Sequence, residues 1–128
     1  MTKLIYVALF LFLLVGCKTR INLAIDSVET ISVAYYSDYE RVEETEFGKG
    51  SRELKGFKLW MSQNIDGWEK YYATQAIGNI YIKGDGFTLN VGPDWVVLNY
   101  EQPKDNYSQL YKSVAAGEFG FLNNDEKP

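Results

Sequence analysis

The sequence predicts an α+β fold: a mainly antiparallel β-sheet built as a meander, with one C-terminal amphipathic helix packed on it. Three observations support this. Apolar and polar residues alternate over 29–36, short β-rich runs separated by turn residues fill 79–100, and apolar residues recur at helical spacing over 107–114. A chain of 128 residues has the length of one domain.

The first predicted element is a strand over 29–36, because Ile31, Val33 and Tyr35 would then share one buried face. Residues 38–47 follow as the expected second arm of a hairpin that turns near Ser37-Asp38.

The middle of the chain supplies two further strand predictions. Residues 56–62 alternate, with Phe57, Leu59 and Met61 on one side, and predict a strand. Residues 68–77 fit both helical spacing and, by their aromatic content, a strand, and we favour the strand.

Residues 79–100 predict a three-strand antiparallel meander. Two turn sequences, Gly84-Asp85-Gly86 and Gly92-Pro93-Asp94, separate its three β-rich runs. Aspartate is common in such turns for backbone reasons, which is the interpretation we favour for Asp85 and Asp94. The alternative, an oxygen-only calcium site, lacks the spacing of an EF-hand.

The C-terminal region predicts the helix. Its apolar residues follow the i, i+3, i+4, i+7 spacing: Tyr107, Leu110, Tyr111 and Val114. Asp105 is the expected N-cap, and Gly117 is the expected end of the helix. Beyond it, three apolar residues are expected to dock on the core: Phe119, Phe121 and Leu122. Residues 123–128 are expected to be a flexible tail.

Composition excludes several functions. The chain has no histidine and one cysteine, which excludes a Ser-His-Asp triad, a Cys-His dyad, a His/Cys metal site and an internal disulfide. With 13 basic and 17 acidic residues the formal charge is −4, and nucleic acid is not an expected partner. Any catalysis would depend on carboxylates, Lys, Ser or Tyr, so we expect no enzyme. Glu43 and Glu44 are adjacent and would face opposite sides of a strand, so they cannot form an acid–base pair.

The N-terminus carries the most specific motif. Lys3 precedes an uncharged apolar run over 4–15, which is too short for a transmembrane helix but suits the central region of a signal peptide. The run ends in Leu14-Val15-Gly16-Cys17, which resembles the lipobox of bacterial lipoproteins. The alternative is an ordinary secretory signal with an incidental cysteine.

The resemblance to lipoproteins implies a covalent lipid and a place in the cell. It implies a diacylglyceryl group on the sulfur of Cys17, cleavage of residues 1–16, and an N-acyl chain on the new terminus. No other cofactor is expected. In that family, Lys18 rather than aspartate after the cysteine favours the periplasmic face of the outer membrane over the inner membrane. Loss of Lys3 with the signal would make the mature charge −5.

These assignments divide the chain into four parts. Residues 1–16 are the expected signal, 17–27 the acylated cysteine with a short tether, 28–122 one globular β-rich domain and 123–128 the tail. Basic residues of the tether, Lys18 and Arg20, would add weak attraction to anionic head groups or would simply keep the flank soluble.

Acidic residues gather in one predicted strand. If 38–47 is a regular strand, four acids share a face with Val42 and form an acidic stripe: Asp38, Glu40, Glu44 and Glu46. Such a stripe could steer a basic partner. The alternative is charge that protects an edge strand from aggregation. Tyr36 is the member of the Tyr35-Tyr36 pair expected on the outer face, where it would either join the binding surface or pack against neighbouring strands.

Two functions follow as hypotheses. The first is a membrane-tethered, non-catalytic binding module of the inhibitor, immunity or exclusion type, whose partners are the membrane, through the lipid, and a basic envelope protein. The second is a structural or assembly lipoprotein of the envelope. The first rests on the small size, the lipid anchor, the missing catalytic groups and the acidic stripe.

Overall fold

The computed structural model describes residues 18–73, 77–102 and 106–122. These residues form one antiparallel sheet and one α-helix, α2 (Arg52–Gln63). The seven strands, in chain order, are β1 (Ile31–Ser37), β2 (Glu40–Phe47), β3 (Glu69–Lys70), β4 (Ile80–Gly84), β5 (Phe87–Val91), β6 (Trp95–Gln102) and β7 (Asn106–Ser113). Two 3₁₀ turns, η1 (Ile25–Ser27) and η2 (Gly120–Leu122), flank them.

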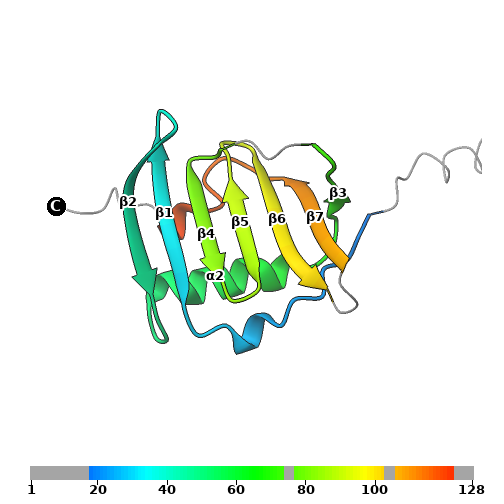
Figure 1. Ribbon diagram of the computed structural model, residues 1–128. Coiled ribbons are helices and arrows are strands. Elements are labelled where there is room, and N and C mark those ends of the chain that lie inside the picture. Colours follow the sequence, from blue (N-terminus) through cyan, green and yellow to red (C-terminus); the bar gives the residue numbers. More distant parts are fainter. Residues whose placement is uncertain (1–17, 74–76, 103–105, 123–128) are drawn as a thin grey trace, which may run out of the picture.

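The strands lie in the order β2-β1-β4-β5-β6-β7-β3, so β2 and β3 are the two edges of the sheet. Helix α2 crosses one face of this sheet, as Figure 1 shows. The core lies between the two layers. There the rings of Phe57 on α2 and Phe87 on β5 stack with centroids 5.5 Å apart. A sheet must bury one face to be stable, and α2 covers that face.

The predicted hairpin and meander are confirmed. Strands β1 and β2 pair antiparallel across a turn at Asp38-Tyr39, and β4, β5 and β6 are consecutive antiparallel neighbours. The alternation that predicted β1 is also visible in its burial, since Ile31 and Val33 are buried on the helix side. The fold is therefore mostly an antiparallel sheet with one helix, as expected.

The prediction of a C-terminal helix is wrong. Residues 106–113 form β7, which pairs with β6 at eight positions from Trp95↔Ser113 to Gln102↔Asn106. In this strand Leu110 faces the core and is 1% exposed. Tyr111 points to the opposite face, where its ring stacks on Tyr71.

The strand predicted at 56–62 is wrong as well, because this segment belongs to α2. Ser51 caps the helix by accepting a hydrogen bond from the backbone N–H of Leu54 at 3.2 Å. The buried residues of α2 recur at helical spacing: Leu54, Phe57, Trp60 and Met61. Leu59, which the strand prediction places on the buried side, is 58% exposed. Gly56 lets Phe121 approach α2, because an added Cβ would lie 2.7 Å from the Phe121 ring.

Of the strand predicted at 68–77, only Glu69 and Lys70 belong to a strand, β3, which pairs with β7. Residues 71–73 continue beside β7, where the backbone N–H of Tyr71 donates to the carbonyl of Gln109 at 2.9 Å. The side chain of Gln109 in turn donates to the carbonyls of Tyr71 and Ala73. Residues 74–76 lie outside the described residues.

Residues 19–27 pack on the domain, whereas the sequence predicts a short tether over 17–27. Ile21 is 6% exposed, and its backbone N–H donates to the carbonyl of Ile65 at 2.9 Å. Thr19 forms an antiparallel bridge with Trp68. At the other end, Phe119 and Leu122 are buried in the core, as predicted. The tail predicted at 123–128 and the signal predicted at 1–16 lie outside the described residues.

Candidate functional site

The β1–β2 hairpin forms one end of the sheet and carries the predicted site residues. Its tip consists of Asp38 and Tyr39, whose φ angles are 51° and 65°. Two positive φ angles belong to a tight hairpin turn whose twist matches that of the strands. Tyrosine rarely adopts this backbone conformation, and Tyr39 is also 80% exposed. The tip therefore carries an exposed aromatic ring on a residue whose backbone conformation is strained.

A β-bulge divides the predicted acidic stripe. Tyr35 pairs with Glu43, but the next residue, Tyr36, pairs with Arg41, so β2 contains one extra residue at Val42. Side chains on the two sides of a bulge no longer follow one alternation. The prediction that four acids share one face with Val42 is therefore wrong for this strand.

The register assigns each acid to a face. Glu44 and Glu46 lie opposite Ala34 and Ser32, on the sheet face that α2 leaves open. Glu40 lies opposite Ser37, which alternates onto the helix side. Asp38 lies in the turn itself and is exposed. The bulge thus spreads the carboxylates around the edge rather than along one face.

The open face of β2 is partly neutralised. Glu44 accepts from Arg41 Nη1 at 2.8 Å and from the hydroxyl of Ser32 at 2.9 Å. Both partners of the ion pair are about half exposed, so the pair contributes at most about 1 kcal/mol. Tyr36, paired with Arg41, is half-buried on this face. The sequence does not predict the ion pair of Arg41 with Glu44, because a regular strand would place these two side chains on opposite faces of the sheet.

Glu43 faces the helix side, opposite to Glu44, as the adjacent positions predicted. It lies opposite Tyr35, whose hydroxyl donates to the carbonyl of Leu122. Burial raises the pKa of Tyr35 above its usual value, and the nearby charges of Glu43 and Glu53 raise it further. The hydroxyl is therefore held protonated as a structural donor, not as a base.

Apolar side chains are exposed beside the acids. Val42, at the bulge, is 70% exposed and Tyr39 is 80% exposed. Among the described residues, β2 has no strand neighbour on its outer side. We call this region the acidic edge: β2 with the Asp38-Tyr39 turn. It combines carboxylates, two exposed apolar side chains and a free strand edge. The exposure of Tyr39 was predictable from the sequence, since a two-residue turn between two strands places this residue at the tip of the hairpin.

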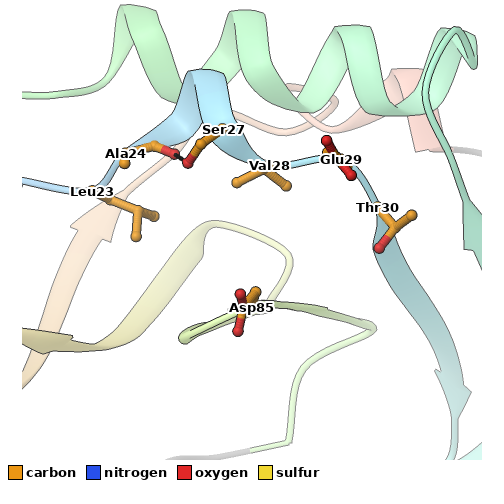
Figure 2. A pocket seen from close by; sticks show the side chains of 7 residues that line it. All are labelled: Leu23, Ala24, Ser27, Val28, Glu29, Thr30 and Asp85. Carbon is orange, nitrogen blue, oxygen red and sulfur yellow. Dashed lines mark hydrogen bonds between the residues drawn. The ribbon is translucent and has the colours of Figure 1, made fainter.

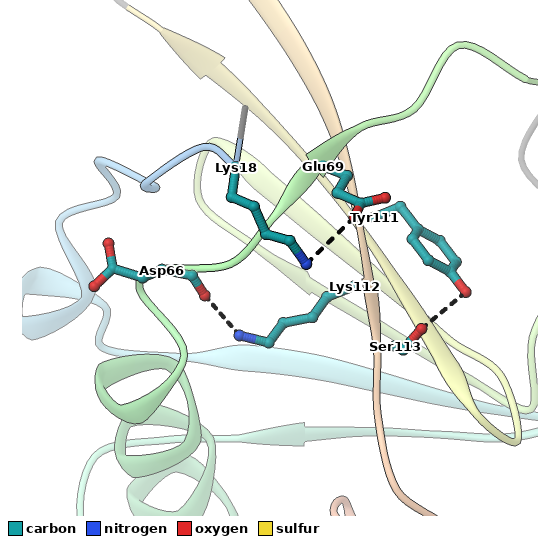
Figure 3. Close-up of polar contacts among 6 residues, drawn as sticks. All are labelled: Lys18, Asp66, Glu69, Tyr111, Lys112 and Ser113. Atoms are coloured by element: carbon teal, nitrogen blue, oxygen red, sulfur yellow. Dashed lines mark hydrogen bonds and ion pairs between the residues drawn. The ribbon is translucent and has the colours of Figure 1, made fainter. Parts of the chain in front are cut away.

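The other edge of the sheet is held together by polar contacts, several of which Figure 3 shows. Lys112 Nζ donates to the carbonyl of Asp66 at 2.6 Å. It also lies 5.7 Å from the centre of the Trp68 ring. Lys18 Nζ lies 3.3 Å from a carboxylate oxygen of Glu69. Burial lowers the pKa of Lys112, and the charge of Lys18 lowers it further, against the opposing effects of Glu118 and Asp66. We call this region the anchor edge: residues 18–19, 66–72 and the end of β7.

A hollow of about 290 Å³ lies at a third place, beneath the segment that leads into β1. Figure 2 shows Ser27, Glu29 and Thr30 along the segment on one side of the hollow, with Asp85 on the opposite side. Asp85 lies in the turn between β4 and β5, as predicted. Within the described ranges, no three His, Cys, Asp or Glu side chains are grouped as a metal site. The hollow thus presents two separated carboxylates.

Cys17, the predicted lipidation site, immediately precedes the first described residue, Lys18. No helix in the part of the chain that the structure describes is long and apolar enough to span a bilayer. Comparison of the chain with models of known protein families, with curated proteins and with solved structures finds no match. Its function is therefore inferred from its own residues.

Proposed function

We propose that this protein is a lipoprotein anchored through Cys17 to the periplasmic face of the outer membrane, where it acts as a non-catalytic module that binds a basic envelope protein. The lipobox Leu14-Val15-Gly16-Cys17 supports the anchor. Two or three acyl chains hold a protein on a bilayer, since each buried CH₂ contributes about 0.8 kcal/mol.

The acidic edge supports the binding role. The single observation that carries the proposal is the exposure of Tyr39 and Val42 on a strand edge that also bears four carboxylates: Glu40, Glu43, Glu44 and Glu46. Charge by itself would protect an edge strand from aggregation. Exposed apolar side chains work against that protection, but they suit a protein interface, where aromatic residues contribute most of the affinity.

The binding role is tested by crosslinking in intact cells. A photoreactive phenylalanine analogue at position 39 is expected to crosslink one protein at a constant ratio. The matched control carries the same analogue in place of Leu59, which is exposed on α2 away from this edge. Equal crosslinking from positions 39 and 59 would contradict a binding surface at the acidic edge. No crosslink from position 39, together with an envelope defect in cells that lack the protein, would favour the structural or assembly role.

Charge reversal tests the role of the carboxylates. Glu40→Lys/Glu46→Lys is expected to slow association with the crosslinked partner roughly tenfold at low salt, with a smaller effect at high salt. Glu29→Lys/Glu101→Lys makes the same change in net charge at exposed positions outside β2 and is the control. Equal association rates for both variants, measured by surface plasmon resonance, would remove the acidic residues from the proposal.

The anchor has its own test. Cys17→Ser is expected to abolish the mass increase due to acyl chains and to leave the protein in the unprocessed form or outside the membrane fraction. Mass spectrometry and fractionation measure both. A normally processed Cys17→Ser chain of unmodified mass that stays with membranes would contradict lipidation.

A further inference from the structure

The folded domain reaches almost to the predicted lipid attachment. Thr19 donates its backbone N–H to the carbonyl of Trp68 at 2.6 Å, and Trp68 donates back to Thr19 at 3.2 Å. Trp68 is fully buried, so this bridge is attached to the core. Two residue steps join Thr19 to Cys17, and an extended chain covers at most about 7 Å in that number of steps. A lipid on Cys17 would therefore hold the anchor edge at the membrane surface.

The direction of the bridge identifies which residues of the anchor edge come closest to the lipid. Because the bridge is antiparallel, the step back from Thr19 to Lys18 runs from Trp68 toward Glu69. The ion pair between Lys18 and Glu69 agrees with this direction. The chain thus leaves the described residues heading toward Lys70 and Tyr72.

These residues have the chemistry of a membrane–water interface. Tyr72 is 89% exposed, and Lys18 and Lys70 are exposed as well. Tyrosine is enriched at the level of the lipid head groups because its ring is apolar and its tip polar, and lysine is attracted to anionic lipids. An exposed tyrosine on the segment that pairs with the start of the described chain is therefore matched to the head-group layer.

We infer that the anchor edge lies against the lipid surface, with Lys70 and Tyr72 in the head-group layer, and that the sheet holds the acidic edge away from the membrane. This inference rests on the lipidation of Cys17 proposed above. Six inter-strand spacings of about 4.8 Å separate β2 from β3, or roughly 29 Å across the sheet. Figure 1 shows the two strands at opposite ends of the sheet.

Two exposed tyrosines on opposite edges provide a matched test. Tyr72→Cys and Tyr39→Cys each introduce one reactive thiol, because the chain has one cysteine and acylation blocks its sulfur. The full-length lipidated variants are labelled with a fluorescent maleimide and reconstituted in phosphatidylethanolamine–phosphatidylglycerol vesicles that contain lipids with nitroxide head groups. The label at position 72 is expected to be quenched at least threefold more than the label at position 39. Lys70→Cys is a second reporter that keeps Tyr72 in place, and it is expected to behave like Tyr72→Cys.

Flotation of the vesicles separates the two possible failures. A chain that floats with the vesicles but is quenched equally at positions 39, 70 and 72 overturns the orientation and leaves lipidation intact. Stronger quenching at position 39 than at positions 70 and 72 overturns it as well. A chain that does not float contradicts lipidation itself, and the orientation falls with it.

Discussion

The two edges of the sheet differ in length and in the residues that support them. β2 is eight residues long, and none of its side chains is fully buried. β3 is two residues long and follows directly on Trp68, which is fully buried. A short edge supported by a buried residue offers little backbone to another chain, whereas a long exposed edge offers a full strand. The difference shows that one edge of the sheet is supported by a buried residue of the core, whereas the other presents a long strand with no strand neighbour among the described residues.

The largest effect is expected at the anchor edge. Trp68→Ala should reduce the free energy of unfolding by about 3–5 kcal/mol, because it removes a fully buried ring. The same ring packs edge-on against Trp60 and lies under the ammonium group of Lys112. Urea unfolding followed by circular dichroism measures the loss. A loss below about 1 kcal/mol would show that the anchor edge is not supported as described.

An intermediate effect on the free energy of unfolding is expected at Tyr35, where the β1–β2 hairpin contacts the C-terminal part of the core. Tyr35→Phe removes the hydrogen bond to the Leu122 carbonyl and should cost about 1 kcal/mol at pH 8. Because the pKa of Tyr35 is raised in the folded chain above 10.0, its stabilising contribution is present below pH 10 and is lost as the pH rises through the folded pKa.

The consequence for pH dependence is specific to this hydroxyl. The wild-type protein should lose more stability between pH 8 and pH 11 than Tyr35→Phe does, since phenylalanine does not ionise. Urea unfolding of both proteins at the two pH values gives the difference, in which the titration of all other groups largely cancels. Parallel losses would show that the Tyr35 pKa is not raised.

The smallest effect is expected at the tip of the acidic edge, and it has the opposite sign. Tyr39→Gly should raise the free energy of unfolding by up to about 1 kcal/mol, because glycine accepts a positive φ and Asp-Gly is a favoured hairpin turn. It should also weaken capture of the partner at least tenfold. Tyr72→Ala, at an equally exposed tyrosine outside such a turn, should change stability by less than about 0.5 kcal/mol. A destabilised Tyr39→Gly variant with full partner binding would contradict both roles of the tip.

Much of the fold was predictable because it follows from local patterns. The hairpin β1–β2 and the meander β4–β6 have period-two alternation and recognisable turns, and these are properties of neighbouring residues. The errors at α2 and β7 concern segments whose sequences satisfy both periods. In α2, Met61 fits a strand with Phe57 and a helix with Leu54 equally well, so the choice depends on what covers the sheet.

The candidate site was only partly predictable for a related reason. The sequence supplies the acids of β2 and their adjacency, so the opposite facing of Glu43 and Glu44 could be predicted. The bulge at Val42 could not be predicted, because it is defined by how β2 pairs with Tyr35 and Tyr36 on β1. One extra residue transferred Arg41 to the face of Glu44 and moved Glu40 to the other face.

The sequence by itself determined the motif Leu14-Val15-Gly16-Cys17 that resembles a lipobox, the missing histidine and the strands of the central meander, since each is a matter of residue type or local spacing. Only the tertiary structure decided that Asn106–Ser113 completes the sheet as β7 and that 52–63 covers it as a helix. It also decided that residues 19–28 pack on the domain. The physical reason is that these segments gain their conformation from burial against distant partners, and a local pattern does not contain those partners.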